Sequence, residues 1–258
     1  MHASFSLTDN TVLIVGASSA IGQATAEIFL THQAKLILVD IDQIKLDALR
    51  EKLTPHVQEP QQLYILAHRM DSPEQRQQLM EQIFERHESI DVMVYAAGIE
   101  GKVGSSLQIQ DSDLDEIMQI NLNAPRHITQ LLLPSMKLRQ KGSLIYISSI
   151  AAVRGNRQIG LYALSKAALC QMARNIAVEF GVDNIRANCI LPGLIDTPFA
   201  EKLIQNPDFI KGRLAKTPLK RIGKPLEIAA TALFLAADAS AFMTGQSLIV
   251  DGGTTISD

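Results

Sequence analysis

The chain has 258 residues, of which 47% are apolar and 20% are charged, and its formal net charge is -3. This composition is ordinary for a globular protein and excludes a disordered chain. The slightly acidic balance argues against nucleic acid or an anionic membrane as the main partner. We expect one domain over residues 1–258, located in the cytoplasm, with a small molecule as its ligand.

Membrane, disulfide and metal signals are absent from the sequence. No apolar run approaches the roughly 18 residues that a membrane-spanning helix needs, and the first residues lack the order of a secretion signal. Cys170 and Cys189 are too few for a disulfide framework, and the six histidines stand singly. We therefore predict buried, inert thiols and no metal site.

Short β-rich runs alternate with helical stretches along the chain. Nearly continuous apolar strands joined by helices are typical of a parallel sheet that is covered on both faces. The predicted fold is an α/β, Rossmann-type, doubly wound domain with a seven-stranded parallel sheet. The strands are expected at 11–15, 35–39, 63–66, 91–95, 144–147, 185–191 and 247–250, and the helices are expected to start near residues 20, 41, 73, 111, 161 and 225.

Residues 198–224 depart from this alternation. Pro198, Pro207 and Pro218 stand there among charged residues. We predict a mobile flap over a site. Its apolar residues follow a helical spacing, which fits either the lining of an apolar pocket or the packing of the flap onto the core.

The first predicted strand runs into a turn that begins at Gly16 and ends at Gly22. Such a turn before a helix presents backbone N–H groups that bind a pyrophosphate. Asp40 ends the second strand, where a carboxylate accepts hydrogen bonds from the adenosine ribose and repels a 2′-phosphate. An Asp there also suits a helix start, but the two signals together indicate a dinucleotide. Because Ser19 and Ile41 offer no cation, we predict NAD rather than NADP.

Tyr162 and Lys166 stand four residues apart, so a helix carries both side chains on one face. A free tyrosine with a pKa of about 10 is a poor base, but a cation nearby favours the phenolate. Ser149, at the end of an apolar strand, is expected to hydrogen-bond the same substrate oxygen. A lone Tyr–Lys pair is usually a surface contact, but the three residues together predict a proton-transfer site.

These residues together resemble the short-chain dehydrogenase/reductase family over about residues 8–253. The family's glycine turn appears as Val15–Gly22, and its Asn-Asn-Ala-Gly motif appears as Tyr95–Gly98 with both amides replaced. The resemblance implies that Asn121 holds a water linked to Lys166, with Asn123 as a competing candidate. The implied catalytic residues are Asn121, Ser149, Tyr162 and Lys166.

The resemblance also implies where the cofactor binds. The residues concerned lie in the glycine turn, after the second, third, fourth and sixth strands, and on the catalytic helix. They are Gly16, Ser18, Ser19, Ile21, Gly22, Asp40, Ile41, Asp71, Ala97, Gly98, Tyr162, Lys166, Pro192, Gly193, Ile195 and Thr197.

The implied activity is NAD-dependent interconversion of a secondary alcohol and a ketone by hydride transfer, with Tyr162 as the general acid and base. The resemblance implies a homotetramer, and the predicted helices 111–137 and 161–180 carry apolar positions on more than one face.

Two other functions stay open. The first is a 3-oxoacyl-carrier-protein reductase, whose basic residues beside the catalytic face are loosely matched by Lys137, Arg139 and Lys141. The second is a non-catalytic NAD sensor, which would use the same fold without needing the Tyr–Lys pair. Three cations are candidates for an anionic substrate group, although long cations at a pocket mouth are more often solvated. They are Lys102, Arg154 and Arg157.

Overall fold

The computed structural model describes residues 4–257, so the ends of the predicted domain, 1–3 and 258, lie outside it. Seven strands form one parallel sheet in the order β3-β2-β1-β4-β5-β6-β7. The strand order reverses between β1 and β4, and a crevice opens at such a switch point beyond the carboxyl ends of the strands. The predicted sheet is confirmed. Its strands are β1 Thr11–Val15, β2 Lys35–Asp40, β3 Leu63–Ala67, β4 Val92–Tyr95, β5 Gly142–Ile147, β6 Ile185–Pro192 and β7 Ser247–Val250.

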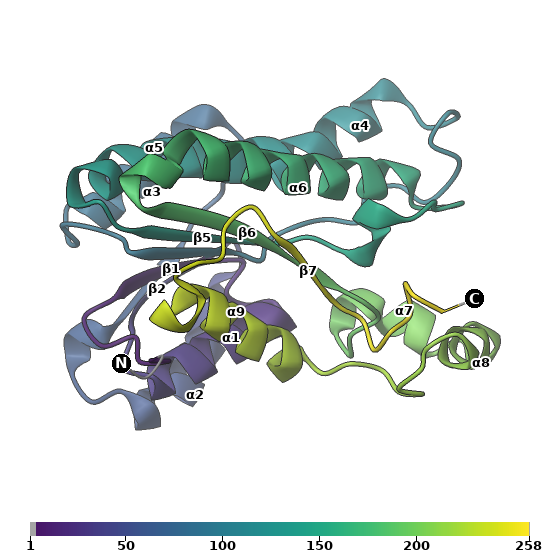
Figure 1. Ribbon diagram of the computed structural model, residues 1–258, viewed down its shortest axis with the longest axis horizontal. Helices are drawn as coiled ribbons and strands as arrows, with labels where there is room; N and C mark the ends of the chain where they lie inside the picture. The colour runs from purple at the N-terminus through teal and green to yellow at the C-terminus, as the bar shows by residue number, and fades with distance from the viewer. Residues whose placement is uncertain (1–3, 258) are drawn as a thin grey trace.

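Helices cover both faces of the sheet (Figure 1). One face carries α3 (Pro73–Phe84), α4 (Asp111–Met118), α5 (Ala124–Arg139) and α6 (Gly160–Phe180), and the other carries α1 (Ala20–Thr31), α2 (Gln43–Leu53) and α9 (Pro225–Ala236). α2 starts at Gln43 because the Asp42 side chain caps it by accepting from the Lys45 amide. The short 3₁₀ turns are η1 Thr54–His56, η2 Pro60–Gln62, η4 Ile150–Val153, η5 Gly181–Asp183 and η7 Asp238–Ser240.

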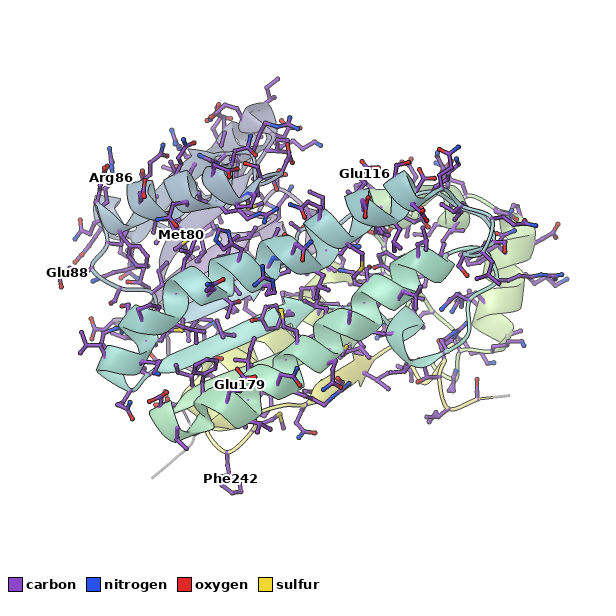
Figure 2. All side chains as sticks on the ribbon, turned by 90° about the horizontal axis from the view of Figure 1, so that it is seen from above. Met80, Arg86, Glu88, Glu116, Glu179 and Phe242 are labelled. Atoms are coloured by element: carbon purple, nitrogen blue, oxygen red, sulfur yellow. The ribbon has the colours of Figure 1, made fainter. Side chains whose placement is uncertain are left out.

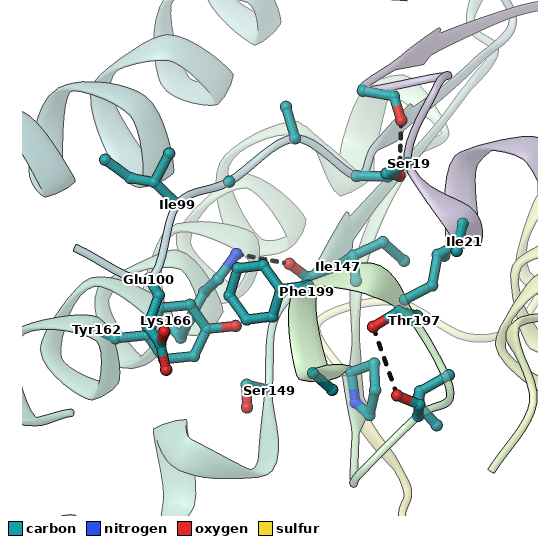
Figure 3. A pocket seen from close by; sticks show the side chains of 18 of the residues that line it. Ser19, Ile21, Ile99, Glu100, Ile147, Ser149, Tyr162, Lys166, Thr197 and Phe199 are labelled. Atoms are coloured by element: carbon teal, nitrogen blue, oxygen red, sulfur yellow. Dashed lines mark hydrogen bonds between the residues drawn. The ribbon is translucent and has the colours of Figure 1, made fainter. Parts of the chain in front are cut away.

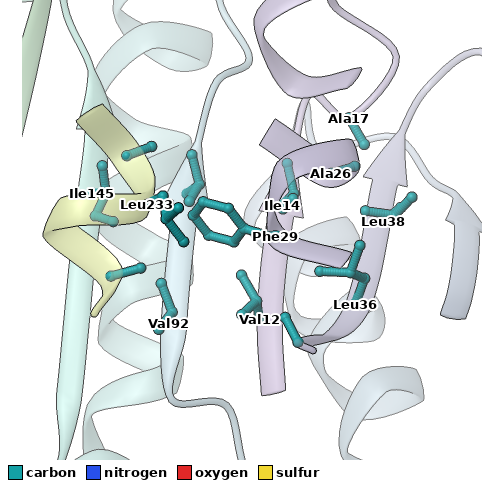
Figure 4. Close-up of a cluster of buried hydrophobic side chains, with 14 of the residues drawn as sticks. Val12, Ile14, Ala17, Ala26, Phe29, Leu36, Leu38, Val92, Ile145 and Leu233 are labelled. Carbon is teal, nitrogen blue, oxygen red and sulfur yellow. The ribbon is translucent and has the colours of Figure 1, made fainter. Parts of the chain in front are cut away.

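The sheet separates two hydrophobic clusters. Along β1, Val12 and Ile14 belong to the cluster under α1 and α9, whereas Leu13 and Val15 belong to the opposite one. This is the alternation that a strand imposes on its side chains. Phe29 of α1 packs in the first cluster (Figure 4). Because both faces are covered by helices, the strands are apolar at nearly every position.

The predicted helix 111–137 is interrupted by a π-helical turn, η3 (Gln119–Asn123), which joins α4 to α5. In this turn the Ala124 amide donates to the Gln119 carbonyl, five residues back. Pro125 follows and has no N–H to donate to the Asn121 carbonyl, four residues before it. The helix axis therefore continues, but its hydrogen-bond register shifts where Asn121 is buried.

Residues 198–224 contain more helix than the sequence suggested. The segment includes η6 (Pro198–Ala200), α7 (Glu201–Ile204) and α8 (Pro207–Ala215). Two of its three prolines occupy first helical positions, where the missing N–H costs nothing. The ring of Phe199 lies 6.1 Å from the ring of Tyr162, centre to centre. The segment therefore lies over the predicted catalytic helix, while its motion as a flap stays a prediction.

Several apolar positions of the predicted helices 111–137 and 161–180 lie in the core. Ile117 and Leu169 are fully buried and Ile176 is 7% exposed, because α4 and α6 pack on the sheet. Exposed apolar side chains lie elsewhere, for example at Val178, and at Phe242, which projects from the turn before β7 (Figure 2). None of the helices within residues 4–257 is long and apolar enough to cross a membrane.

Candidate active site

A cavity of about 990 Å³ lies at the carboxyl ends of the central strands. Every residue predicted for catalysis or cofactor binding lines this cavity except Gly22 and Asn121. Gly22 lies in the first turn of α1, and the Asn121 side chain lies just behind Gly98. The fold thus brings segments from seven parts of the sequence to one site.

The glycine turn leaves no room for larger residues at its two ends. Gly16 has a φ of +82°, and a Cβ there would collide with the Ala97 amide, while a Cβ on Gly22 would collide with the Gly16 carbonyl. Ser19 accepts from the Gly22 amide at 3.1 Å and donates to the Gly16 carbonyl at 2.7 Å. The first amides of α1 have no partner inside the helix, so this turn holds them ready for a phosphate.

Asp40 lies beside the glycine turn at the end of β2. One carboxylate oxygen accepts from the Ser18 amide at 3.0 Å, and the other accepts from the Ile41 amide at 2.8 Å. These bonds fix the carboxylate at the wall of the cavity. Contact of this carboxylate with an adenosine ribose stays a prediction.

Two cations that the sequence analysis missed line the same end of the cavity, Lys45 and Arg69. Lys45 pairs with Asp42 at 3.1 Å, and Arg69 donates to Asp71 at 2.6 Å. A carboxylate therefore engages each of them. No motif marks either residue, because only the packing of α2 and of the loop after β3 brings them to the cavity.

The segment after β6 lines another part of the cavity. Pro192, Gly193, Ile195 and Thr197 all contribute to the lining. The Thr197 hydroxyl donates to the Ile195 carbonyl across a long 3.4 Å (Figure 3). A bond of that length is weak, so the hydroxyl is available to a ligand.

Tyr162 and Lys166 project into the cavity from the first two turns of α6 (Figure 3). The Nζ of Lys166 lies 5.5 Å from the centre of the Tyr162 ring and donates to the Ile147 carbonyl at 3.0 Å. The helix thus places the ammonium close to the phenol, as the spacing predicted. The Ile147 carbonyl, at the end of β5, fixes the direction of the Lys166 side chain.

Two serines follow β5, and the structure separates their tasks. Ser148 is buried and donates to the Lys166 carbonyl at 2.9 Å, which ties β5 to α6. Ser149 is partly accessible, lines the cavity and accepts from the Ala151 amide at 3.1 Å. Because a hydroxyl both accepts and donates, Ser149 retains its proton for a substrate oxygen.

Burial dominates the ionisation of the Tyr–Lys pair. It raises the pKa of Tyr162 to about 12, against the opposing effect of Ser149, and the charge of Glu100 adds to the rise. Burial also lowers the pKa of Lys166 to about 8. The expected lowering of the phenol pKa by Lys166 is therefore not found in the protein alone, because burial raises this pKa and Lys166 is not among the groups that shift it. A phenolate near neutral pH needs further positive charge in the cavity.

Asn121 clamps the loop after β4 onto α6. Its Oδ1 accepts from the Ile99 amide at 2.9 Å, and its Nδ2 donates to the Ile99 carbonyl at 2.9 Å and to the Ser165 hydroxyl at 3.0 Å. Both Nδ2 protons are therefore used, and the side chain has no donor left for a water. Asn123, the competing candidate, donates to Gln119 at 2.9 Å and does not line the cavity.

Tyr95 supplies a support where the resembled motif has an Asn. Its hydroxyl donates to the Ile120 carbonyl at 2.9 Å. The π turn diverts the Ala124 amide from this carbonyl to that of Gln119. Burial raises the pKa of Tyr95, so the hydroxyl stays protonated and can donate. One side chain thus joins the end of β4 to the turn that carries Asn121.

We expect Tyr95→Phe to lower the free energy of unfolding by about 1–3 kcal/mol, because the Ile120 carbonyl would lose its donor. Turnover should also fall, since the π turn holds Asn121. Tyr146→Phe is the matched control, because Tyr146 is as buried and hydrogen-bonds Thr129 at 2.8 Å outside the cavity. Urea unfolding and kcat are to be measured for both. An equal loss of kcat in the two variants would contradict the positioning role of Tyr95.

Only one of the three cations proposed for a substrate anion lines the cavity, and that is Arg154. Lys102 instead pairs with Asp113 at 3.5 Å, and Arg157 lies outside the lining. Arg213 of α8 also lines the cavity. Arg213 was not among the predicted residues, because the sequence does not show which side chains of the flap face inward.

The doubly wound sheet carries a glycine turn at its switch point, and a Tyr–Lys pair lies in the same cavity. Together these features define a class of protein, the oxidoreductases that use a dinucleotide. A family model described as enoyl-(acyl carrier protein) reductase matches residues 16–255. The chain belongs to the short-chain dehydrogenase/reductase family, which binds a nicotinamide cofactor.

Several relatives match nearly the whole length of the chain. It is 35% identical over 246 residues to a 3-oxoacyl-[acyl-carrier-protein] reductase of Thermotoga maritima, with 95% of this chain and 97% of the relative covered. It is similar to a 7 alpha-hydroxysteroid dehydrogenase complexed with NADH and 7-oxo glycochenodeoxycholic acid, at a TM-score of 0.90, 29% identity, and coverage of 96% and 95%. It is also similar to a gluconate 5-dehydrogenase from Burkholderia cenocepacia in complex with NADP and tartrate, at a TM-score of 0.91, 26% identity and 98% coverage of both chains.

Proposed function

We propose that the protein interconverts a secondary alcohol and a ketone by hydride transfer with NAD. The observation that carries the proposal is that Ser149, Tyr162 and Lys166 share one cavity with the glycine turn and Asp40. The residues fit a dinucleotide, because the turn offers backbone amides at one end and the Tyr–Lys pair lies at the other. Bound NAD supplies the hydride acceptor, and its oxidised ring brings a positive charge to the cavity.

In the oxidative direction, Tyr162 as phenolate takes the hydroxyl proton of the substrate while Ser149 donates a hydrogen bond to the same oxygen. Lys166 contributes its charge and would hold the nicotinamide ribose. In reduction the neutral phenol returns the proton. We assign the water-holding role to the Asn121 carbonyl rather than to its side chain, because Pro125 removes that carbonyl's usual helical donor.

A panel of secondary alcohols, sugars, hydroxy acids and steroids with NAD tests this function. We expect at least one compound to give the absorbance of NADH, and its ketone to consume NADH in reverse. A protein that binds NAD but transfers no hydride to or from any of these would contradict the proposal. That result would favour the non-catalytic NAD sensor.

We propose NAD rather than NADP because Asp40 presents a carboxylate where a 2′-phosphate would lie. Two like charges placed together cost up to several kcal/mol. The wild type should therefore prefer NAD in kcat/KM, and Asp40→Asn should shift the preference toward NADP by about tenfold or more. Asp47→Asn is the control, because Asp47 is exposed on α2 and outside the cavity. Equal use of both cofactors by the wild type would refute the choice.

A second candidate, reduction of a 3-oxoacyl group on a carrier protein, is supported by the 35% identity to the Thermotoga maritima reductase. The basic residues first considered for carrier docking offer little support. Arg139 and Lys141 pair with the buried Asp91 at 2.5 and 3.2 Å, and Lys137 pairs with Asp183 at 3.7 Å. Turnover of an acetoacetyl thioester with NADH or NADPH tests this candidate directly.

We also propose a homotetramer and a cytoplasmic location, in keeping with the family. Val178, Val182 and Phe242 are each more than four-fifths exposed, and exposed apolar side chains of this size favour a subunit contact. Light scattering on the purified protein should give the mass of four chains. A monomer in solution would contradict this assembly.

A further inference from the structure

A pair of arginines lies where two cavities meet. Arg154, just after η4, and Arg213, in α8, line the cavity that holds Ser149 and Tyr162, and both also line a second cavity of about 550 Å³. Arg154 follows Ser149 by five residues, so the chain leads directly from the proton-transfer site to this junction. The part of a substrate that extends beyond its reacting carbon would reach the pair.

Among the residues that the structure describes, no carboxylate pairs closely with either guanidinium group. Within residues 4–257, neither lies within salt-bridge distance of a carboxylate. Burial, followed by the like charge of Arg154, lowers the pKa of Arg213, although Asp251 opposes the shift. The Phe209 ring lies 5.4 Å from the Arg213 guanidinium carbon and helps to hold it. A half-buried cation beside a like charge is stabilised when an anion binds between the two.

The second cavity adds further groups that can bind an anion. Its lining includes a third cation, Lys216, and the hydroxyl residues Thr254, Thr255 and Ser257. The Oγ1 of Thr255 is buried and has no hydrogen-bond partner among the described residues. Asp208 is the one acidic residue among the described residues that line this cavity. Positive charge and an unused hydroxyl suit an anionic oxygen group.

Charge also orients a ligand in the first cavity. Glu100, on the loop after β4, lies near Tyr162 (Figure 3) and its charge raises the pKa of that phenol. An anionic group is repelled from this side of the cavity and attracted to Arg154 and Arg213. A substrate with one anionic end would therefore bind in a single direction, with its anion away from the reacting carbon.

We propose that the substrate carries an anionic oxygen group, a carboxylate or a phosphate, which binds between Arg154 and Arg213 while its alcohol or ketone carbon lies at Tyr162. The proposal rests on the proposed oxidoreductase function and names its substrate class. The guanidinium group suits either anion, because both accept paired hydrogen bonds from its planar donors.

Matched substrates that differ in charge test this proposal and separate the two anions. Gluconate is compared with the neutral polyol sorbitol, and a 3-oxoacyl phosphopantetheine thioester is compared with its dephosphorylated form. We expect kcat/KM to be about tenfold to a hundredfold higher for the anionic member of one pair. The pair that shows the difference identifies carboxylate or phosphate. Equal kcat/KM within both pairs would overturn the proposal.

Variants locate the effect at the two arginines. Arg154→Gln and Arg213→Gln should each raise KM for the preferred anion by about tenfold or more and change kcat little, because neither residue contacts the reacting carbon. Arg157→Gln is the matched control, since Arg157 lies outside both cavities. A loss of kcat with KM unchanged, or the same KM in all three variants, would contradict the assignment.

Measuring anion binding tests the proposed anion site independently of the proposed reaction. Tartrate and inorganic phosphate are titrated by calorimetry into wild-type protein and into the Arg154→Gln, Arg213→Gln double variant, each saturated with NADH. At least one probe should bind the wild type about tenfold or more tightly than the double variant. Equal affinities would overturn the anion site even if the enzyme oxidises neutral alcohols. Selective binding would support the site even if no alcohol is turned over.

Discussion

Replacing Tyr162 by Phe is expected to lower kcat by about 10²–10⁴-fold, the usual contribution of a general acid or base. The substitution removes one oxygen and leaves the ring to pack near Phe199, 6.1 Å away. The Tyr162 carbonyl still accepts from the Ser165 hydroxyl at 2.8 Å, so α6 keeps its local structure. NADH titration by fluorescence should therefore show nearly unchanged affinity. Steady-state kinetics in both directions measures the loss.

The pH dependence of the oxidation rate gives a second, independent test of the role of Tyr162. Because burial raises the pKa of Tyr162 to about 12, the phenolate fraction grows as pH increases through the neutral and alkaline range. Oxidation by the wild type should accelerate with pH, whereas Tyr162→Phe should lose this dependence. Tyr64→Phe is the control, since Tyr64 on β3 lies outside the cavity. Substantial oxidation by Tyr162→Phe would contradict the assigned role.

Replacing Lys166 by Met is expected to lower kcat/KM by about 10²–10³-fold, because a preorganised positive group would be lost from the cavity. The affinity for NADH should fall as well, which distinguishes this variant from Tyr162→Phe. Folding should persist, since an apolar side chain of similar volume replaces a buried ammonium. Kinetics, NADH titration and urea unfolding measure the three quantities.

The charge of Lys166 also predicts a pH effect on binding. Because its pKa is lowered to about 8, the ammonium loses its proton as pH rises through that value. NADH affinity of the wild type should weaken over this range, and Lys166→Met should not show the transition. Lys137→Met is the control, since Lys137 is half exposed and outside the cavity. Unchanged NADH affinity in Lys166→Met would contradict the proposed contact with the cofactor.

Local patterns were sufficient to predict the sheet. Every predicted strand lies within two residues of an observed one at each end, because a parallel strand covered on both faces must be apolar at nearly every position. The glycine turn could also be predicted from the sequence, since Gly16 and Gly22 occupy places where a Cβ would collide with the backbone. The four-residue spacing of Tyr162 and Lys166 placed both side chains in one cavity, because a helix returns to the same face after four residues.

Other features depended on distant parts of the chain. The π turn combines the missing N–H of Pro125 with a hydrogen bond from Tyr95, and these residues lie on different elements. Arg213 reaches the cavity through the placement of α8, which no periodicity encodes. The direction of the Tyr162 pKa shift also escaped prediction, because spacing shows that a cation is near but not how much water burial removes.

By itself the sequence determined where the strands lie, the glycine turn for a dinucleotide and the spacing of the proton-transfer residues. Each of these depends on neighbours within a few positions. Only the tertiary structure decided which cations face the cavity and how the buried phenol ionises. These properties depend on exposure and on contacts between residues far apart in the chain. A one-dimensional pattern does not carry that information.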